Sequence, residues 1–153
     1  MFIKTFKVKK PSVALAGIIV LIIAIIAVIA VITHKLGNPP VYELKSESAR
    51  QQFLHEMGWS VPEEYDECRV IIIPEEFNKV YKNYNDLQKE QGFNLEKYKG
   101  KTVEMYTYSV YNYDGYEDKD CIKCNLLVCD GMLIGGDVCS TEIGGFMQGL
   151  RKG

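Results

Sequence analysis

Three cysteines that could carry chemistry fall within "CIKCNLLVC", residues 121–129. The Cys121-x-x-Cys124 spacing is typical of a zinc knuckle or of a thioredoxin-type redox pair. Both uses need the two sulfurs to converge, whereas a β-strand points side chains three residues apart to opposite faces. The segment is apolar and ends at Asp130-Gly131, a strong hairpin signal. We therefore expect a strand whose cysteines act as small apolar residues, and no metal site.

The Asp130-Gly131 turn also predicts how the two flanking strands pair. Val128 is expected opposite Leu133, and Cys129 opposite Met132. Further along, Cys124 is expected opposite Asp137, and Ile122 opposite Cys139. Cys124 and Cys139 would then be diagonal neighbours on one face, with Cα atoms about 7 Å apart. A disulfide prefers about 5.5–6 Å, so a Cys124–Cys139 bridge needs help from twist or from a bulge at Gly135-Gly136. A second alternative also stays open: a thiol redox or metal-binding module that uses Cys121, Cys124, Cys129 and Cys139.

Other reactive side chains offer little for catalysis. His34 and His55 are the two histidines, and His55 falls on the polar side of a predicted helix, which indicates a surface imidazole. Glycine pairs occur at residues 135–136 and 144–145 without the spacing of a nucleotide-binding loop. We therefore predict that the chain is not an enzyme and requires no cofactor.

Four tyrosines in "TVEMYTYSVYNY", residues 102–113, suggest a recognition surface instead. In a strand, Tyr106 and Tyr108 share one face, and Tyr111 and Tyr113 share the other. One pair is expected beneath helices and the other on the open face of the sheet. Exposed tyrosine suits the binding of a protein or sugar, because its ring is apolar and its hydroxyl forms hydrogen bonds. Ordinary packing between aromatic side chains of neighbouring strands is the alternative.

Residues 13–32 contain no charged or hydrogen-bonding side chain. A helix of this length spans about 30 Å, the thickness of the hydrocarbon core of a bilayer. The segment is longer than the apolar region of a cleavable signal peptide, the competing interpretation, and no small-x-small cleavage site follows it. We expect an uncleaved transmembrane helix that contacts the lipid bilayer.

Charge predicts the orientation of this helix. Residues 1–12 carry four lysines and no acid, so they are expected to form a cytoplasmic basic arm with the rest of the chain outside. Beyond residue 32 the net charge is −6, which offers no electrostatic footprint for nucleic acid. Residues 33–45 contain "GNPP" and are expected to be a linker, followed by an exported domain over residues 46–153.

The exported domain alternates helix and strand signals. Ser46 is a predicted N-cap for a helix through Met57, and a second helix is expected from Pro74 to about Gln91. Strands are expected in residues 68–73, 102–113, 121–129 and 132–140, and a weak last helix after them. This order predicts an α+β domain with an antiparallel sheet of about four strands and two to three helices on one face.

Three segments resemble a known family. They are "PEEFNKVYKNYNDLQKEQGFNLEKYKGK", "YTYSVYNY" and "NLLVCDGMLIGGDVCSTEIGGFMQGL". Over residues 46–150 the chain resembles an uncharacterised bacterial family of single-pass membrane-anchored proteins with an exported domain of unknown function. The resemblance implies location and topology but no activity, ligand or catalytic residue. Together these patterns predict a non-catalytic extracytoplasmic domain that binds an envelope protein or a sugar at the cell membrane.

Overall fold

The computed structural model describes residues 21–28, 41–117 and 119–153. Residues 21–28 are helical, and their apolar side chains are exposed. Within the described residues, no helix combines the length and the apolar character needed to cross a membrane. The basic arm, most of the predicted linker, and residues 13–20 and 29–32 of the predicted transmembrane helix lie outside the described residues.

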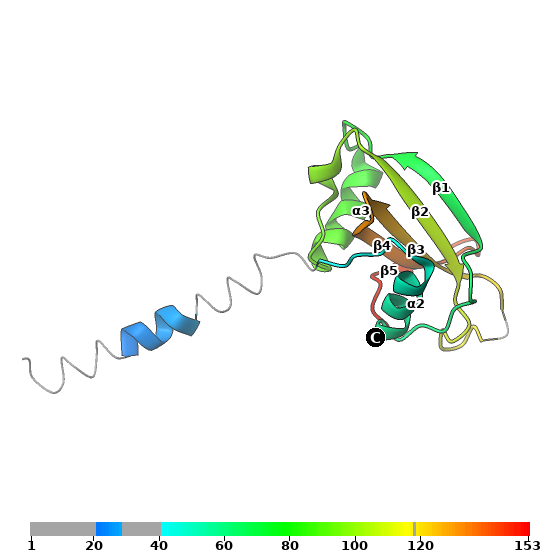
Figure 1. Cartoon of the computed structure of the whole chain (residues 1–153), viewed down its shortest axis with the longest axis horizontal. Coiled ribbons are helices and arrows are strands. Elements are labelled where there is room, and N and C mark those ends of the chain that lie inside the picture. The colour runs from blue at the N-terminus through cyan, green and yellow to red at the C-terminus, as the bar shows by residue number, and fades with distance from the viewer. Residues whose placement is uncertain (1–20, 29–40, 118) are drawn as a thin grey trace, which may run out of the picture. The chain divides into compact units, whose positions relative to one another are not determined.

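Five antiparallel strands form one sheet in chain order (Figure 1). They are β1 (Glu67–Ile72), β2 (Thr102–Ser109), β3 (Ile122–Cys129), β4 (Met132–Ser140) and β5 (Met147–Gln148). The α+β class and the antiparallel sheet are confirmed. The fifth strand was not predicted, because it arises in the glycine-containing tail where the sequence indicated a weak helix. This strand is very short, and it pairs with the end of β4.

Helix α2 (Glu47–Glu56) begins where the sequence predicted, with the Ser46 side chain accepting a hydrogen bond from the Ala49 amide. Helix α3 (Lys79–Glu90) begins later than expected, because the Asn78 side chain rather than Pro74 forms the N-cap. A short 3-10 helix, η1 (Leu95–Tyr98), follows it. The later start leaves Phe77 outside the helix, where its ring is buried against the sheet.

The two helices cover opposite faces of the sheet, so the prediction that they share one face is wrong. Leu126 and Leu127 are neighbours in β3 and therefore point to opposite faces. Leu126 packs in a cluster with Phe53 of α2, whereas Leu127 packs in a second cluster with Leu95 of η1 and the aromatic residues of α3. We refer to these surfaces as the α2 face and the α3 face. The domain thus has three layers.

A β-bulge in β4 changes the pairing with β3. Near the turn, Val128 pairs with Leu133 and Cys129 with Met132, as predicted. Beyond that point Leu127 pairs with Gly135, so Ile134 is an extra residue and every later pair is shifted by one. The predicted pairs Cys124–Asp137 and Ile122–Cys139 are therefore wrong, and Cys124 pairs with Val138 instead. The shift reverses the face to which each later β4 side chain points.

The end of the predicted linker belongs to the folded domain. The Leu44 amide donates to the Gly131 carbonyl at 2.8 Å, and the Leu133 amide donates to the Tyr42 carbonyl at 2.9 Å. Leu44 itself is buried in the cluster beneath α2. The predicted boundary at residue 46 is thus too late, because residues 42–44 pair with the outer edge of β4.

Candidate functional site

A groove of about 720 Å³ lies between α3 and the sheet. All five strands contribute to its floor or rim, and α3 forms the opposite wall. Its apolar lining consists of Ile71, Val80, Leu87, Met105, Leu127 and Met147, and its polar lining of Tyr81, Asn83, Tyr84, Asn125 and Asp137. Ligand sites are commonly concave and apolar with a few well-placed polar groups, and this groove has that composition.

Aromatic residues hold α3 above the sheet. The ring centroids of Phe77 and Tyr81 are 4.7 Å apart, and those of Tyr81 and Tyr84 are 6.1 Å apart. Residues three apart in a helix lie on one side of it, so Tyr81 and Tyr84 share one face of α3, and Phe77, which precedes the helix, continues this row of rings. Val80, on the same helix, is 75% exposed and stands at the rim of the groove. The helix therefore leaves an open apolar side next to the sheet.

A buried carboxylate, Asp137 of β4, lies at the polar part of the groove. Asp137 is only 3% exposed. One of its oxygens accepts a hydrogen bond from the Tyr84 hydroxyl at 2.8 Å, and the other accepts one from the Asn125 amide nitrogen at 3.0 Å. The Asn125 amide oxygen in turn accepts from the Thr107 hydroxyl at 2.8 Å. This chain of hydrogen bonds crosses strands β2, β3 and β4 and reaches α3.

The environment of Asp137 makes it a strong acceptor. Burial raises the pKa of the Asp137 carboxyl, while the hydrogen bonds from Asn125, Tyr84 and Cys139 act in the opposite direction. The pKa of Tyr84 lies well above its ordinary value, because burial and the adjacent Asp137 both disfavour the phenolate. Tyr84 therefore stays protonated, and its hydroxyl donates a hydrogen bond to Asp137. Since each carboxylate oxygen can accept a second hydrogen bond, a ligand donor in the groove has a partner here.

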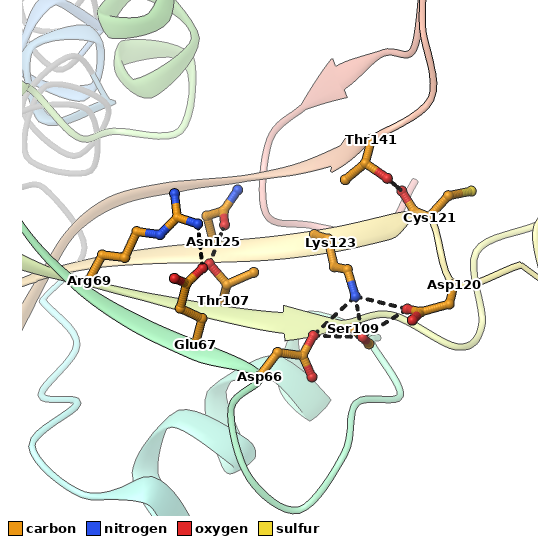
Figure 2. A network of polar contacts seen from close by, with 10 residues as sticks. All are labelled: Asp66, Glu67, Arg69, Thr107, Ser109, Asp120, Cys121, Lys123, Asn125 and Thr141. Atoms are coloured by element: carbon orange, nitrogen blue, oxygen red, sulfur yellow. Dashed lines mark hydrogen bonds and ion pairs between the residues drawn. The ribbon is translucent and has the colours of Figure 1, made fainter.

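Beyond the groove, the α3 face carries a second polar cluster (Figure 2). Lys123 donates to the Ser109 hydroxyl at 2.6 Å, to Asp120 at 2.8 Å and to Asp66 at 3.2 Å. Ser109 also donates to Asp66 at 2.6 Å. The cluster joins the ends of β2 and β3 to the segment that precedes β1.

A serine beside a lysine can act as a nucleophile and its base, provided that the lysine is neutral. Partial burial lowers the pKa of Lys123, but the hydrogen bonds and charges of Asp120 and Asp66 outweigh it, and the net pKa is raised. Lys123 is therefore an ammonium that donates to Ser109 and cannot take its proton. The cluster serves to tie strands together.

The four tyrosines predicted for recognition do not form one open surface. Tyr108 is fully buried, with its hydroxyl between Arg50 at 3.0 Å and Glu47 at 2.9 Å. The Arg50 guanidinium lies over the Tyr106 ring, with its central carbon 3.9 Å from the ring centroid. Tyr106 and Tyr108 therefore both pack under α2. Tyr111 and Tyr113 follow the end of β2 and do not lie on the sheet. Tyr113 stacks between other aromatic rings, including Trp59, and Tyr111 is exposed.

All five cysteines are free thiols. The bulge places Cys139 opposite Lys123 on the α3 face, whereas Cys124 lies in the core beneath α2, so the predicted Cys124–Cys139 pair is separated by the sheet. Burial raises the pKa of Cys124 well above its ordinary value and that of Cys139 to about 11. Raised values keep thiols protonated, which weakens them as nucleophiles and ligands. In the part of the chain that the structure describes, no three His, Cys, Asp or Glu side chains converge as metal ligands would.

Sequence reasoning missed the residues that combine at the groove. Asp137 is a charged residue within the apolar segment "MLIGGDVCS", and an acid in a buried strand is a usable signal for a polar site. Asn125 interrupts "CIKCNLLVC" in the same way. The contacts of Asp137 with Asn125 and Tyr84 depend on the bulge and on the position of α3, and no local sequence pattern predicts either.

Comparison with known proteins identifies the domain without assigning an activity to it. No curated protein and no solved structure matches the chain. Residues 53–138 match the model of the domain of unknown function (DUF4830), and the chain therefore belongs to that family.

Proposed function

We propose that this chain is a non-catalytic binding protein of the cell envelope, held at the membrane by one N-terminal helix. Support for the anchor comes from the uncharged residues 13–32 and the four lysines that precede them. In this proposal residues 1–12 remain in the cytoplasm, and the α+β domain lies outside. The partner is an envelope protein or another molecule of that compartment.

The observation that carries the binding proposal is the groove between α3 and the sheet. It combines a large apolar lining with one buried acceptor, Asp137. The apolar walls favour an apolar ligand, because each buried square ångström contributes about 25 cal/mol. Asp137 favours a ligand that also carries a hydrogen-bond donor or a positive charge. We therefore expect an apolar ligand or side chain with one N–H or ammonium group.

The proposal of a non-catalytic role has separate support. The Ser109–Lys123 pair is held in its protonated form by two carboxylates. In the groove, the hydroxyl beside the Asp137 carboxylate is that of Tyr84, and burial together with Asp137 raises the pKa of Tyr84 and keeps it protonated. The raised thiol pKa values of Cys124, Cys129 and Cys139 support this role over a thiol redox or metal-binding module. The apolar and polar side chains that line the groove therefore suit the binding of a ligand better than catalysis.

Binding in the groove can be tested with a fluorescent apolar amine. N-phenyl-1-naphthylamine is neutral, fluoresces strongly only in apolar surroundings, and carries one N–H donor. We expect a saturable rise in its fluorescence with the full-length protein. Val80→Trp should weaken this binding at least about tenfold, since the indole would fill the rim of the groove.

Val70→Trp is the matched control, because Val70 is a valine of similar exposure, 70%, outside the groove. It should bind the probe like the wild type. An equal loss in both variants, or no saturable signal in the wild type, would refute the groove as an apolar binding site.

The proposed topology has its own test, since Cys68 is exposed on the sheet edge. A membrane-impermeant maleimide applied to intact cells should label the wild type, and Cys68→Ser should lose most of this labelling. Labelling that requires cell lysis would place the domain on the cytoplasmic side and overturn the proposed location.

A further inference from the structure

Strand β1 ends the sheet, and its outer edge is open (Figure 1). Within the described residues, no strand or isolated bridge pairs with that edge. The other end of the sheet is protected differently, because residues 42–44, β5 and the side chains of Gln88 and Gln91 bind the outer edge of β4. An open edge of six residues can therefore accept another strand.

The pairing with β2 determines which backbone groups of β1 point outward. The Ile73 amide donates to the Lys101 carbonyl at 3.0 Å, so residue 73 directs its backbone groups toward β2. Direction alternates along an antiparallel strand. Ile71, Arg69 and Glu67 therefore also face β2, while the amides and carbonyls of Cys68, Val70 and Ile72 face outward.

The same three residues carry the exposed side chains of the strand. Val70 is 70% exposed and Ile72 is 66% exposed, and Cys68 is exposed as well. They share the α2 face, where α2 itself covers only the more central strands. Natural edge strands usually carry charged side chains, proline or a bulge that prevents pairing. Residues 68–72 contain no proline or bulge, and their one charged side chain, Arg69, is paired with Glu67. Free hydrogen-bonding groups and uncovered apolar side chains thus coincide.

We propose that β1 pairs antiparallel with β1 of a second copy of this chain, about a two-fold axis at Val70. In this register Val70 lies opposite Val70 of the second copy, and Cys68 lies opposite Ile72. Every outward amide and carbonyl of these residues then finds a partner, and the apolar side chains meet on one face. The two sheets become one continuous sheet.

Charge compatibility favours a second copy as the occupant. Glu67 and Arg69 form an ion pair of 2.6 Å within the strand, so the charges on the other face of β1 are already neutralised (Figure 2). Residues 67–72 carry no net charge, although the chain beyond residue 32 is acidic. Two copies that meet along β1 therefore bring no net charge together at the strand, in contrast to the acidic domain as a whole.

A competing register explains why the axis lies at Val70. Centring the pair on Cys68 would place Glu67 opposite Arg69 of the second copy, but it would also require the backbone of Asp66. The Asp66 amide already donates to the Thr107 carbonyl at 2.8 Å, and Ile72 would be left outside the pair. The Val70 register uses every outward group of the strand and covers both exposed aliphatic side chains.

A single strand pair is a small interface, so the isolated chains should associate weakly. Anchoring both copies in one membrane, as proposed above, raises their effective concentration and promotes the pair. The β1 pairing itself does not depend on the groove or on its ligand. Its test can therefore fail or succeed separately from the binding test.

Sedimentation of the full-length protein in mild detergent tests this pairing. We expect a concentration-dependent monomer–dimer equilibrium for the wild type. Val70→Lys should raise the dissociation constant at least about tenfold, because it places two ammonium groups opposite each other at the axis. Val80→Lys is the matched control, since it changes a valine of similar exposure on α3 and should leave the dissociation constant unchanged.

Cross-linking provides a second readout that does not depend on a disruptive variant. In a Cys68→Ser background, Val70→Cys should be joined into a covalent dimer by a short bis-maleimide, whereas Val80→Cys should give only the background of the parent. A wild type that stays monomeric at all concentrations would overturn the proposal. So would a Val70→Lys protein that dimerises like the wild type, or a Val70→Cys protein that cross-links no better than its parent.

Discussion

The Tyr84 hydroxyl of α3 donates a 2.8 Å hydrogen bond to the Asp137 carboxylate of β4, across 53 residues of sequence. This contact joins the helix to the sheet at the polar part of the groove. It also provides a donor for a carboxylate that is almost fully buried. The stability of the domain and the shape of its candidate site therefore depend on the same pair.

Removing the Tyr84 hydroxyl should destabilise the domain. Tyr84→Phe leaves one Asp137 oxygen without this donor, and a buried acceptor that loses its partner costs about 1–3 kcal/mol. Urea denaturation at neutral pH measures the loss. Tyr81→Phe changes the preceding ring of the same row and should cost less than about 0.5 kcal/mol. Equal effects of the two variants would contradict a specific role for the Tyr84–Asp137 contact.

Asp137 should make stability depend on pH in a defined direction. Because burial raises its pKa above the ordinary value of 3.8, the folded protein holds this proton more tightly than the unfolded chain. The resulting stabilisation is complete below the ordinary pKa and is lost as pH rises through the raised folded value. Asp137→Asn lacks this contribution.

The measurement is the free energy of unfolding of both proteins, from about pH 4 to about pH 7. The wild type should lose stability relative to Asp137→Asn as pH increases. Carboxyl groups with lowered pKa, such as Glu47, give the opposite slope but are present in both proteins and cancel in the difference. A difference that stays constant with pH would show that Asp137 titrates normally.

The hydroxyls of Tyr108 and Tyr111 should contribute very differently to the stability of the domain, although the sequence suggested a binding role for both residues. Tyr108→Phe removes the hydroxyl that accepts from Arg50 and donates to Glu47 in the core, which should cost about 1–3 kcal/mol. Tyr111 is 52% exposed, and Tyr111→Phe should change stability by less than about 0.5 kcal/mol. Thermal unfolding of both variants tests the contrast, and a stable Tyr108→Phe protein would contradict it.

The thiols should react in an order set by burial. Cys68 is exposed, whereas Cys124 and Cys129 are buried and have raised pKa values. With an aromatic disulfide reagent at neutral pH we expect one rapid phase, which Cys68→Ser abolishes. All five thiols should react after denaturation without a reductant. Fewer than five would reveal a disulfide, and rapid reaction of Cys121 together with Cys124 would favour a redox pair.

Local signals in the sequence predicted much of the fold. Ser46 and Asp130-Gly131 act through their own backbone neighbourhood, so the first helix and the β3–β4 turn were found where they occur. The start of α3 was missed because Pro74 and Asn78 are both acceptable helix starts, and burial of Phe77 favours the later one. Competition between local signals is settled by tertiary packing.

The site was harder to predict than the fold. An uninterrupted hairpin places Cys139 and Cys124 on one face, and the single extra residue Ile134 reverses this outcome. The same residue turns Asp137 toward Asn125 and Tyr84. The helices were assigned to one face because amphipathic patterns show that a helix is covered, without showing which side of the sheet covers it.

Gly136 offers the sharpest test of this bulged geometry. A Cβ atom at residue 136 would lie 2.4 Å from the Asn125 carbonyl oxygen, a backbone atom that cannot move without opening the β3–β4 pair. The Gly136 amide also donates to Gln88, and its carbonyl accepts from Gln91, so displacement would disturb the C-terminal part of α3 as well. Gly136→Ala should therefore cost about 1–3 kcal/mol or more.

At the neighbouring Gly135 the atom nearest to an added Cβ, 2.8 Å away, is the end of the Gln88 side chain, so Gly135→Ala should cost less. Urea denaturation of both variants measures the difference, and the reverse order of stability would contradict the register described for β4.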